Sequence, residues 1–290
     1  MSGPSTVTRA RKIDSAIYAW TWRLPMLIWQ GLFFVGPLAF MVSMSFFVVK
    51  NYRMQPAFVL DNWANMLSRP FFWSAYFLTL ELALASTVIA SALAFPASYF
   101  LAFRVGETTR RWAIFILIIP FFTSYLVRTY SWQVLLAGNG VLNGLFRFVG
   151  IGTVTMLNTP FATIIGYMTL CLPLVLILQT YALSNIDKRL IEAAYNLGSG
   201  RLNTVVQVII PAAKTGLVVA AVFTFILTFG DYVSPYYLGG SKPPTLSILI
   251  VDTVKSGQQW PRSAVVAICM IATLLAVAFA SISYAYRRRS

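Results

Sequence analysis

The chain has 290 residues, of which 58% are hydrophobic and 10% are charged, and its mean hydropathy is +0.74. Soluble domains carry about a quarter charged residues, so this composition excludes an ordinary soluble protein. It predicts an all-α integral membrane protein, because helices satisfy their own backbone hydrogen bonds in lipid. The net charge is +14, and the absence of histidine together with only two cysteines leaves almost no ligands for a zinc or haem site.

Six apolar runs are long enough to cross a bilayer as helices. They cover residues 24–49, 74–103, 112–136, 160–183, 215–238 and 263–286. The first run is too long for the apolar core of a cleaved signal peptide, so we expect it to be retained as a span. Residues 1–10 are expected to be disordered, and residues 13–23 to lie along the membrane surface as an amphipathic helix. We therefore expect a cytoplasmic segment at 1–23, one membrane domain at 24–286 and a basic tail at 287–290.

The basic residues fall mainly on one side of the predicted spans. Fourteen of the 22 precede the first run, follow the last, or lie between the second and third or the fourth and fifth: Arg9, Arg11, Lys12, Arg23, Arg104, Arg110, Arg111, Lys188, Arg189, Arg201, Lys214, Arg287, Arg288 and Arg289. Cytoplasmic connections carry such an excess, so both termini and residues 186–213 are expected in the cytoplasm. The arginines at the C-terminus lack interleaved aromatic residues, which argues against nucleic acid as a partner.

Two connections are expected to carry short helices. Residues 50–73 are rich in Trp, Phe and Pro, a composition that favours helices lying at the membrane surface. Asp252 and Lys255 belong to another outer segment, residues 242–262, and are expected in a short helix or a re-entrant turn.

Three ionisable residues lie inside predicted spans, where charge is costly and usually functional. They are Glu81, Arg128 and Asp231. Asp231 is followed by Tyr232 and Tyr236, and a carboxylate beside aromatic rings suits an ammonium group. The alternative is that Asp231 pairs with Arg128 and only holds helices together. For Glu81, the alternatives are an interhelical hydrogen bond and contact with a substrate.

Residues 186–213 form a mostly polar segment between the fourth and fifth runs. Asp187 to Leu197 can form about three helical turns, with Leu190, Ala193, Ala194 and Leu197 on one side. Asp187 suits the start of this helix, Gly198 suits a left-handed stop, and Ser199 suits a cap for a second helix. Pro211 suits the first turn of the next span. An ordinary amphipathic helix is the alternative interpretation.

The spacing of this segment resembles a known motif. Glu192-Ala193-Ala194, followed by Gly198 and by the closing Val208, Ile210 and Pro211, is similar to the EAA loop of permease subunits of bacterial ABC importers. Residues 120–132, which include Arg128, Tyr130 and Trp132, and residues 229–240, which begin Phe229-Gly230-Asp231-Tyr232, resemble spans of the spermidine/putrescine permeases. We call residues 186–213 the EAA segment.

The resemblance implies a type I importer permease (MetI-like) fold and a division of labour among chains. Two permease chains, of different sequence, would form one pathway, and a periplasmic binding protein would deliver the substrate. Two copies of a separate subunit would bind ATP and Mg²⁺, because this sequence has no phosphate-binding Gly-x-x-x-x-Gly-Lys-Ser/Thr loop. The residues implied in coupling to the ATPase are Glu192, Ala193, Ala194, Gly198 and Pro211. The candidates along the substrate pathway are Asp231, Tyr232, Tyr236, Glu81, Arg128, Tyr130 and Trp132.

Alternatives remain at this point. Within the importer class, opines, aminoethylphosphonate and ferric iron compete with polyamines as substrates. The competing class is an ion-coupled secondary carrier or channel, which would use its intramembrane charges directly and would need no cytoplasmic docking segment.

Overall fold

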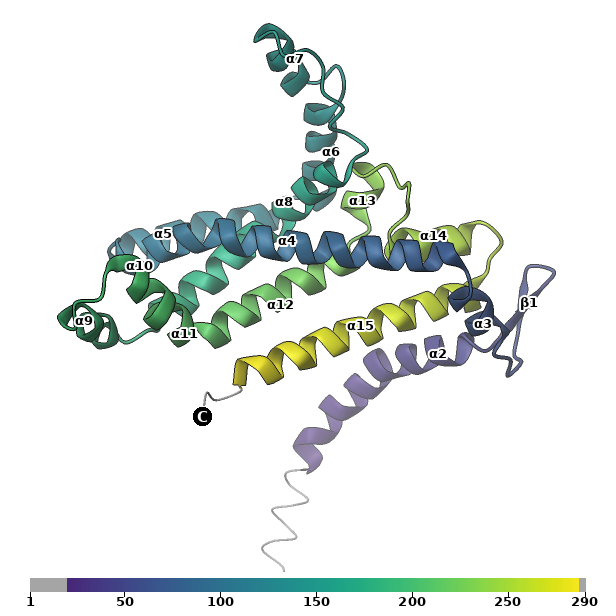
Figure 1. The fold of residues 1–290 in the computed structure, drawn as a ribbon. Helices are drawn as coiled ribbons and strands as arrows, with labels where there is room; N and C mark the ends of the chain where they lie inside the picture. Colours follow the sequence, from purple (N-terminus) through teal and green to yellow (C-terminus); the bar gives the residue numbers. More distant parts are fainter. Residues whose placement is uncertain (1–19, 287–290) are drawn as a thin grey trace, which may run out of the picture. The chain divides into compact units, whose positions relative to one another are not determined.

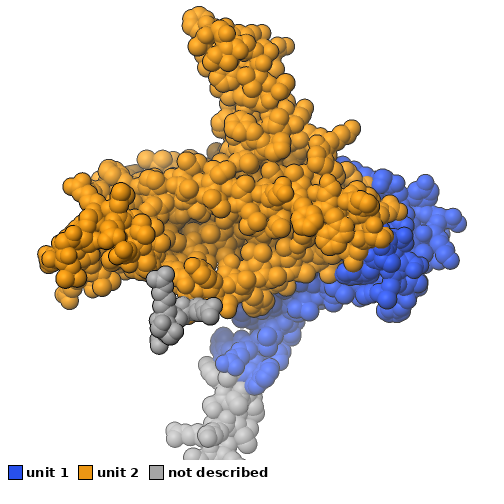
Figure 2. Space-filling model, viewed as in Figure 1, with its two compact units in different colours: residues 1–65, 253–265 blue, residues 66–252, 266–290 orange. Residues whose placement is uncertain are grey.

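The computed structural model of the chain describes residues 20–286. They divide into two compact units, one of Met1–Asn65 and Thr253–Val265, the other of Met66–Asp252 and Val266–Ser290 (Figure 2). The expectations for residues 1–10, for most of the surface helix at 13–23 and for the basic tail at 287–290 lie outside the described residues.

The first unit contains one long apolar helix and a small hairpin. The helix Trp20–Met44 includes the π-helical turn η1 (Gly31–Val35) and α2 (Gly36–Met44). Two short antiparallel strands, β1 (Val48–Lys50) and β2 (Arg53–Gln55), follow before α3 (Asp61–Leu67). Asn51 and Tyr52 both have positive φ, as a two-residue hairpin turn requires. The expectation of only helices over 50–73 is therefore wrong in its first part, and the first span ends before residue 49.

Four described helices are long and apolar enough to cross a membrane, and up to six spans result if each of two bent pairs counts as one. The four are the helix Trp20–Met44, α4 (Pro70–Phe103), α8 (Pro160–Ser184) and α15 (Trp260–Tyr286). The predicted second, fourth and sixth runs are thus single helices.

The third predicted span is not one helix. α5 (Glu107–Ile118) continues as a 3₁₀ turn, η2 (Ile119–Phe122), and the chain then bends by 87° into α6 (Tyr125–Leu136) and α7 (Val141–Phe148). Thr123 and Ser124 have extended backbones, and Pro120 lacks the N–H that a continuous helix needs. The prediction of a continuous helix over 112–136 is wrong for this reason.

The fifth predicted span is shorter than its apolar run. The EAA segment contains α9 (Lys188–Asn196), α10 (Arg201–Thr204), the π-helical turn η3 (Val205–Ile209) and α11 (Ile210–Ala212), and a 75° bend leads into α12 (Lys214–Gly230). Asp231 has an extended backbone that ends α12, so α13 (Val233–Tyr237) is a separate helix. The continuous helix expected over 215–238 is therefore wrong. α14 (Leu246–Lys255) confirms the short helix around Asp252.

The core of the second unit lies where α4, α8 and α12 pack side by side (Figure 1). Small residues meet there, including Ala90 and Ala94 of α4, Cys171 of α8 and Ala220 of α12. A side chain at Gly216 would overlap Ala182, so α12 and α8 approach closely. This close packing fixes the positions of both ends of α12, which carry the candidate functional residues.

Candidate functional site

The EAA segment begins with a helix whose two ends are set by local hydrogen bonds. Asp187 Oδ1 accepts a hydrogen bond from the Arg189 N–H at 3.0 Å, so Asp187 caps α9 as predicted. After α9, Gly198 has φ +81°, and its N–H donates to the Tyr195 carbonyl at 2.9 Å. Glycine tolerates this left-handed conformation best. The structure therefore confirms Gly198 as the stop of this helix.

The second half of the EAA segment differs from the prediction at its cap. Gly200 is the N-cap of α10, and no side chain caps that helix. Ser199 Oγ instead contacts Asn203 Nδ2 at 3.3 Å and Thr204 Oγ1 at 3.2 Å, so the predicted capping role of Ser199 is wrong. Pro211 lies near the end of the helical stretch Arg201–Ala212, directly before the bend into α12. The next span begins at Lys214, so the predicted place of Pro211 in its first turn is wrong.

An apolar cluster joins the EAA segment to the ends of three spans. Its buried members come from α4, from α8 and from the EAA segment itself: Ala102, Leu183, Ile186, Ile209 and Ala213. Ile191 of α9 and Leu217 of α12 pack against this cluster. The EAA segment is therefore packed in one cluster with the ends of α4, α8 and α12.

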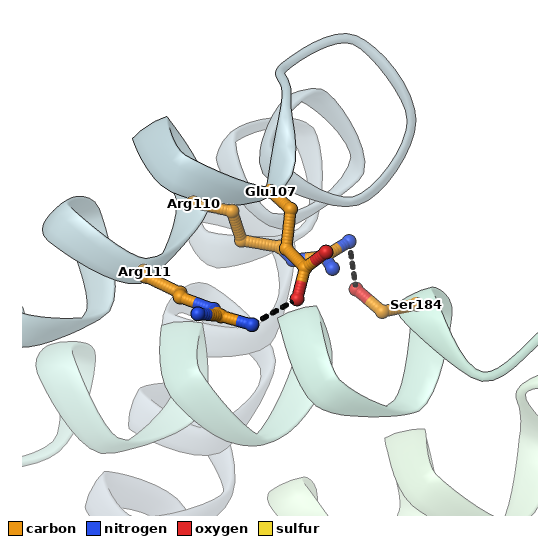
Figure 3. A network of polar contacts seen from close by, with 4 residues as sticks. All are labelled: Glu107, Arg110, Arg111 and Ser184. Atoms are coloured by element: carbon orange, nitrogen blue, oxygen red, sulfur yellow. Dashed lines mark hydrogen bonds and ion pairs between the residues drawn. The ribbon is translucent and has the colours of Figure 1, made fainter.

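A polar contact holds α5 against the same region. Arg110 Nη1 donates to Ser184 Oγ at 3.3 Å, and Ser184 is the last residue of α8, three positions before Asp187 (Figure 3). Arg111 forms an ion pair with Glu107 one turn earlier on α5. The spacing of Glu107 and Arg111 signals their pairing in a helix. The contact between Arg110 and Ser184 spans 74 residues and has no such signal in the sequence.

The outward surface of the EAA segment carries exposed apolar side chains. Leu197 is 89% exposed and Leu202 is 83% exposed. Glu192 and Ala193 are also exposed, whereas Ala194 is buried. Of the apolar face predicted for α9, Leu190, Ala193 and Leu197 therefore remain uncovered in the single chain.

A second group of candidates lies at the other end of α12, around Asp231. Its Oδ2 accepts hydrogen bonds from the Tyr125 hydroxyl at 2.6 Å and the Ser234 N–H at 3.1 Å. Its Oδ1 accepts from the Val233 N–H at 3.0 Å, and Ser247 Oγ donates to its carbonyl oxygen at 2.7 Å. The sequence identified Asp231 but none of these four partners. We call Tyr125, Asp231, Ser234 and Ser247 the Asp231 cluster.

Arg128 does not pair with Asp231 in this structure. Its Nη1 donates to the Thr169 carbonyl at 2.9 Å, and its guanidinium lies 5.9 Å from the centre of the Tyr125 ring. Within residues 20–286, the ion pair that forms is Glu107–Arg111. The alternative of an Asp231–Arg128 pair is therefore wrong for this chain, because nearer donors already satisfy the carboxylate.

Four tyrosines form a continuous set of rings beside the Asp231 cluster. Ring centres are 4.8 Å apart for Tyr130 and Tyr237, 4.9 Å for Tyr237 and Tyr236, and 5.0 Å for Tyr236 and Tyr232. Tyr130 and Tyr236 are partly exposed, so their faces can meet a cation. Trp132, by contrast, packs in an apolar cluster with Leu136. Of the predicted pathway residues, the structure thus brings together Tyr130, Tyr232, Tyr236 and Asp231.

Glu81 lies apart from both groups. It is exposed on α4, on the face opposite the core, and its neighbours along that face are Phe77, Leu84 and Val88. Among the described residues, Glu81 has no hydrogen bond or ion pair, so the expected interhelical hydrogen bond does not form within the chain. A carboxylate inside a span is costly against lipid, so the Glu81 carboxylate itself meets protein or water.

The described residues contain no group of three His, Cys, Asp or Glu side chains able to hold a metal ion. Cys171 is buried in the helical core and Cys269 is partly buried, and both are free thiols. The candidate sites of this chain are therefore surfaces and rings that contact other molecules.

Comparison with known proteins places these features in a family. The model of the family described as "Binding-protein-dependent transport system inner membrane component" matches residues 86–290. The chain belongs to this family. It is therefore the inner-membrane permease of a binding-protein-dependent importer, a transport subunit and not an enzyme.

Individual relatives agree with this assignment. The spermidine/putrescine transport system permease protein PotB of Salmonella typhimurium (strain SL1344) is 28% identical over 83% of this chain and 85% of its own length. The permease fold also occurs in a solved bacterial ABC transporter that imports the acidic polysaccharide alginate. That structure gives a TM-score of 0.73 at 18% identity, covering 99% of this chain and all of its own. The MetNI methionine ABC transporter gives 0.56 at 20% identity over 76% of this permease and all of its own chain.

Proposed function

We propose that this permease imports polyamines such as spermidine and putrescine and that its EAA segment docks onto a separate ATPase. The observation that carries the docking half is the exposure of Leu197 and Leu202 on a segment packed against the ends of α4, α8 and α12. The polyamine half is supported by the similarity to PotB along most of both chains. The ring set of Tyr130, Tyr232, Tyr236 and Tyr237 suits an alkylammonium substrate.

The proposed complex contains two permease chains of different sequence, two ATPase subunits and a periplasmic binding protein. The ATPase subunits bind ATP and Mg²⁺, and each permease chain engages one of them through its EAA segment. ATP binding draws the two EAA segments together, and the apolar cluster around Leu183 and Ile209 transmits the movement to the spans. Such a cycle is alternating access, in which ATP supplies the difference in affinity between two states.

Within the pathway, the proposed roles separate into contact and positioning. The exposed faces of Tyr130 and Tyr236 contact the cation as it passes. Asp231 is a positioning residue, because its carboxylate already accepts three hydrogen bonds from Tyr125, Val233 and Ser234. Glu81, exposed and without a partner among residues 20–286, pairs with a basic group of the second permease chain or of the substrate.

Uptake in proteoliposomes tests the substrate. The permease pair, the ATPase and the binding protein are reconstituted, and ATP-dependent uptake of radiolabelled spermidine and putrescine is compared with that of an opine, aminoethylphosphonate and ferric iron. We expect uptake of the polyamines alone. Uptake of a competing solute without polyamine uptake would replace the proposed substrate while leaving the docking role of the EAA segment intact.

The proposed orientation, with both termini and the EAA segment in the cytoplasm, has its own test. Cysteine is introduced at Gly150 or at Gly200 in a variant that lacks Cys171 and Cys269, and intact cells are labelled with a membrane-impermeant thiol reagent. We expect labelling at position 150 and none at position 200 until the membrane is opened. Labelling at position 200 in intact cells would reverse the orientation.

A further inference from the structure

The second unit contains an open crevice between α4, α12 and α15. Its volume is about 390 Å³, and the side chains that line it are aliphatic or aromatic apart from three hydroxyl groups. Val218, Val222 and Phe225 of α12 form one wall, Leu84 of α4 a second, and Val277 of α15 a third. An exposed apolar surface of this kind marks a site of contact with a membrane or another protein, so we expect another apolar group to cover it.

Two polar contacts fix α15 at the two ends of this crevice. The hydroxyls of Tyr76 on α4 and Thr273 on α15 are 3.0 Å apart, and Thr273 donates its own proton to the Cys269 carbonyl, so Tyr76 is the donor. Near the other end of α15, Lys214 Nζ donates to the Tyr284 carbonyl at 2.6 Å. These two contacts tie α15 to α4 and α12 at the two ends of the crevice.

The lining of the crevice restricts the kind of occupant. Its α12 wall runs from Val218 to Phe225, about 10 Å at 1.5 Å per residue. The polar groups of the lining are the hydroxyls of Thr87, Ser281 and Tyr284. An extended hydrocarbon chain suits a lining of this composition and length.

The charge at one end of the crevice specifies the head of this occupant. Lys214 lies one helical turn before Val218, and its ammonium nitrogen is 3.9 Å from the centre of the Tyr284 ring, which itself lines the crevice. An ammonium group has three donors, and the Tyr284 carbonyl accepts one of them. In the sequence, Arg287, Arg288 and Arg289 follow shortly after Tyr284. Basic pockets between membrane helices at the cytoplasmic side bind anionic headgroups.

We propose that the crevice binds one acyl chain of an anionic phospholipid of the cytoplasmic leaflet, with its phosphate at Lys214. The assignment of the lipid to the cytoplasmic leaflet depends on the orientation proposed above, whereas the binding of the lipid does not. By filling the space between α15 and α12, the lipid holds α15 against the helix that leads from the EAA segment. Lipid composition thereby affects the transport rate.

Native mass spectrometry of the purified full-length permease complex tests this site. The delipidated complex is incubated with phosphatidylglycerol or phosphatidylcholine of identical acyl chains, and retained lipid is counted. We expect phosphatidylglycerol to be preferred about fivefold, the selectivity that one basic side chain near the surface supplies. Lys214→Gln should abolish the preference and Lys214→Arg should keep it. Equal retention of both lipids by the unmodified complex would overturn the proposal.

Adjacent valines provide a matched pair for the apolar part. Val218 lines the crevice, whereas Val219 does not and is 39% exposed. Val218→Trp should reduce retained phosphatidylglycerol at least fivefold, and Val219→Trp should leave it unchanged. If Val218→Trp fails to assemble, Ala221→Phe fills the same crevice. Equal losses from the Val218 and Val219 variants would contradict the site, as would a photo-crosslinker at Val222 that attaches to the second permease chain instead of lipid.

The lipid proposal and the proposed function fail in different ways. Lipid retention requires neither ATP nor substrate. Selective lipid binding by a complex that does not take up polyamines would therefore contradict only the proposed substrate. Selective binding together with labelling of position 200 in intact cells moves the lipid to the outer leaflet. A complex that imports polyamine but shows no lipid selectivity would contradict only the proposed lipid site in the crevice.

Discussion

Before α12, the EAA segment leaves Leu197 and Leu202 almost fully exposed, whereas after α12 three donors of the same chain satisfy the Asp231 carboxylate. The first region has apolar surface that a partner must cover. The second has polar groups that need no partner. The difference separates residues that act on other molecules from residues that hold the permease in shape, although both regions contain charged side chains next to the same helix.

The largest effect is expected at the exposed leucines of the EAA segment, where the proposed ATPase contact lies. Changing both Leu197 and Leu202 to Glu places charge in the proposed contact, and each central contact residue is worth about 2 kcal/mol or more. We expect ATPase binding and uptake to fall by at least about a hundredfold. Co-purification and uptake, at matched permease levels, measure this. Phe148 is 90% exposed at the end of α7 and provides the control. If Phe148→Glu releases the ATPase as completely, the surface around Leu197 is not the contact.

Gly198 and Gly200 differ in backbone conformation within the same loop. Gly198 has φ +81°, Gly200 has φ −69°, and neither has an atom within 4 Å of an added Cβ. Valine at position 198 is strained by about 1–2 kcal/mol, which displaces α10 from α9. We expect Gly198→Val to reduce the initial uptake rate about 5–30-fold and Gly200→Val to have little effect. Equal rates for the two variants would show that the left-handed turn is not needed.

The Asp231 cluster should respond in stability. Tyr125→Phe removes one hydrogen bond to the Asp231 carboxylate, and a hydrogen bond to a charged group is worth about 1.5–3 kcal/mol. Asp231→Asn removes the charge that accepts this bond and those from Val233 and Ser234. Because both variants weaken the Tyr125–Asp231 bond, the double variant should melt close to Asp231→Asn alone. Adding Arg128→Gln to Asp231→Asn should restore nothing, since Arg128 bonds to Thr169. Thermal melting of the purified complex measures this. Recovery of the melting temperature in the Arg128 double variant would support the ion pair instead.

The smallest effect is expected at the α5 contact. Arg110→Gln weakens the hydrogen bond to Ser184 near the start of the EAA segment, whereas Arg111→Gln removes only an exposed ion pair with Glu107. A hydrogen bond of this kind is worth about 1 kcal/mol, so we expect polyamine imported per ATP hydrolysed to fall about two- to fivefold for Arg110 alone. Similar ratios for both variants would show that α5 does not position the EAA segment.

Hydropathy predicts most of the long helices, but it does not predict where helices are interrupted. Runs at 74–103, 160–183 and 263–286 become single helices because about 20 apolar residues favour a span. The bend after Pro120 and the stop at Asp231 interrupt runs that remain apolar on both sides, so a hydropathy average passes over them. The β1–β2 hairpin is equally hidden, because its strands have three residues each and only Asn51 is a typical turn residue.

The same division holds at the candidate sites. Asp187 and Gly198 are predictable because a cap and a left-handed stop depend on neighbours within a few residues. The partner of Asp231 is not predictable from the sequence, because Tyr125 lies 106 residues away. By charge alone, Arg128 is the more obvious candidate. Side-chain pairing across helices requires the packed structure.

Site-specific cross-linking can show whether the ATPase contacts the surface around Leu197. A photo-reactive residue is placed at position 197, at position 202 or, as a control, at Phe148 in the assembled importer, and the attached chain is identified by mass spectrometry. We expect the nucleotide-binding subunit to be attached at positions 197 and 202 and not at position 148. The yield at 197 and 202 should change when ATP is added. Attachment of lipid at 197 and 202, or of the nucleotide-binding subunit at all three positions, would contradict it.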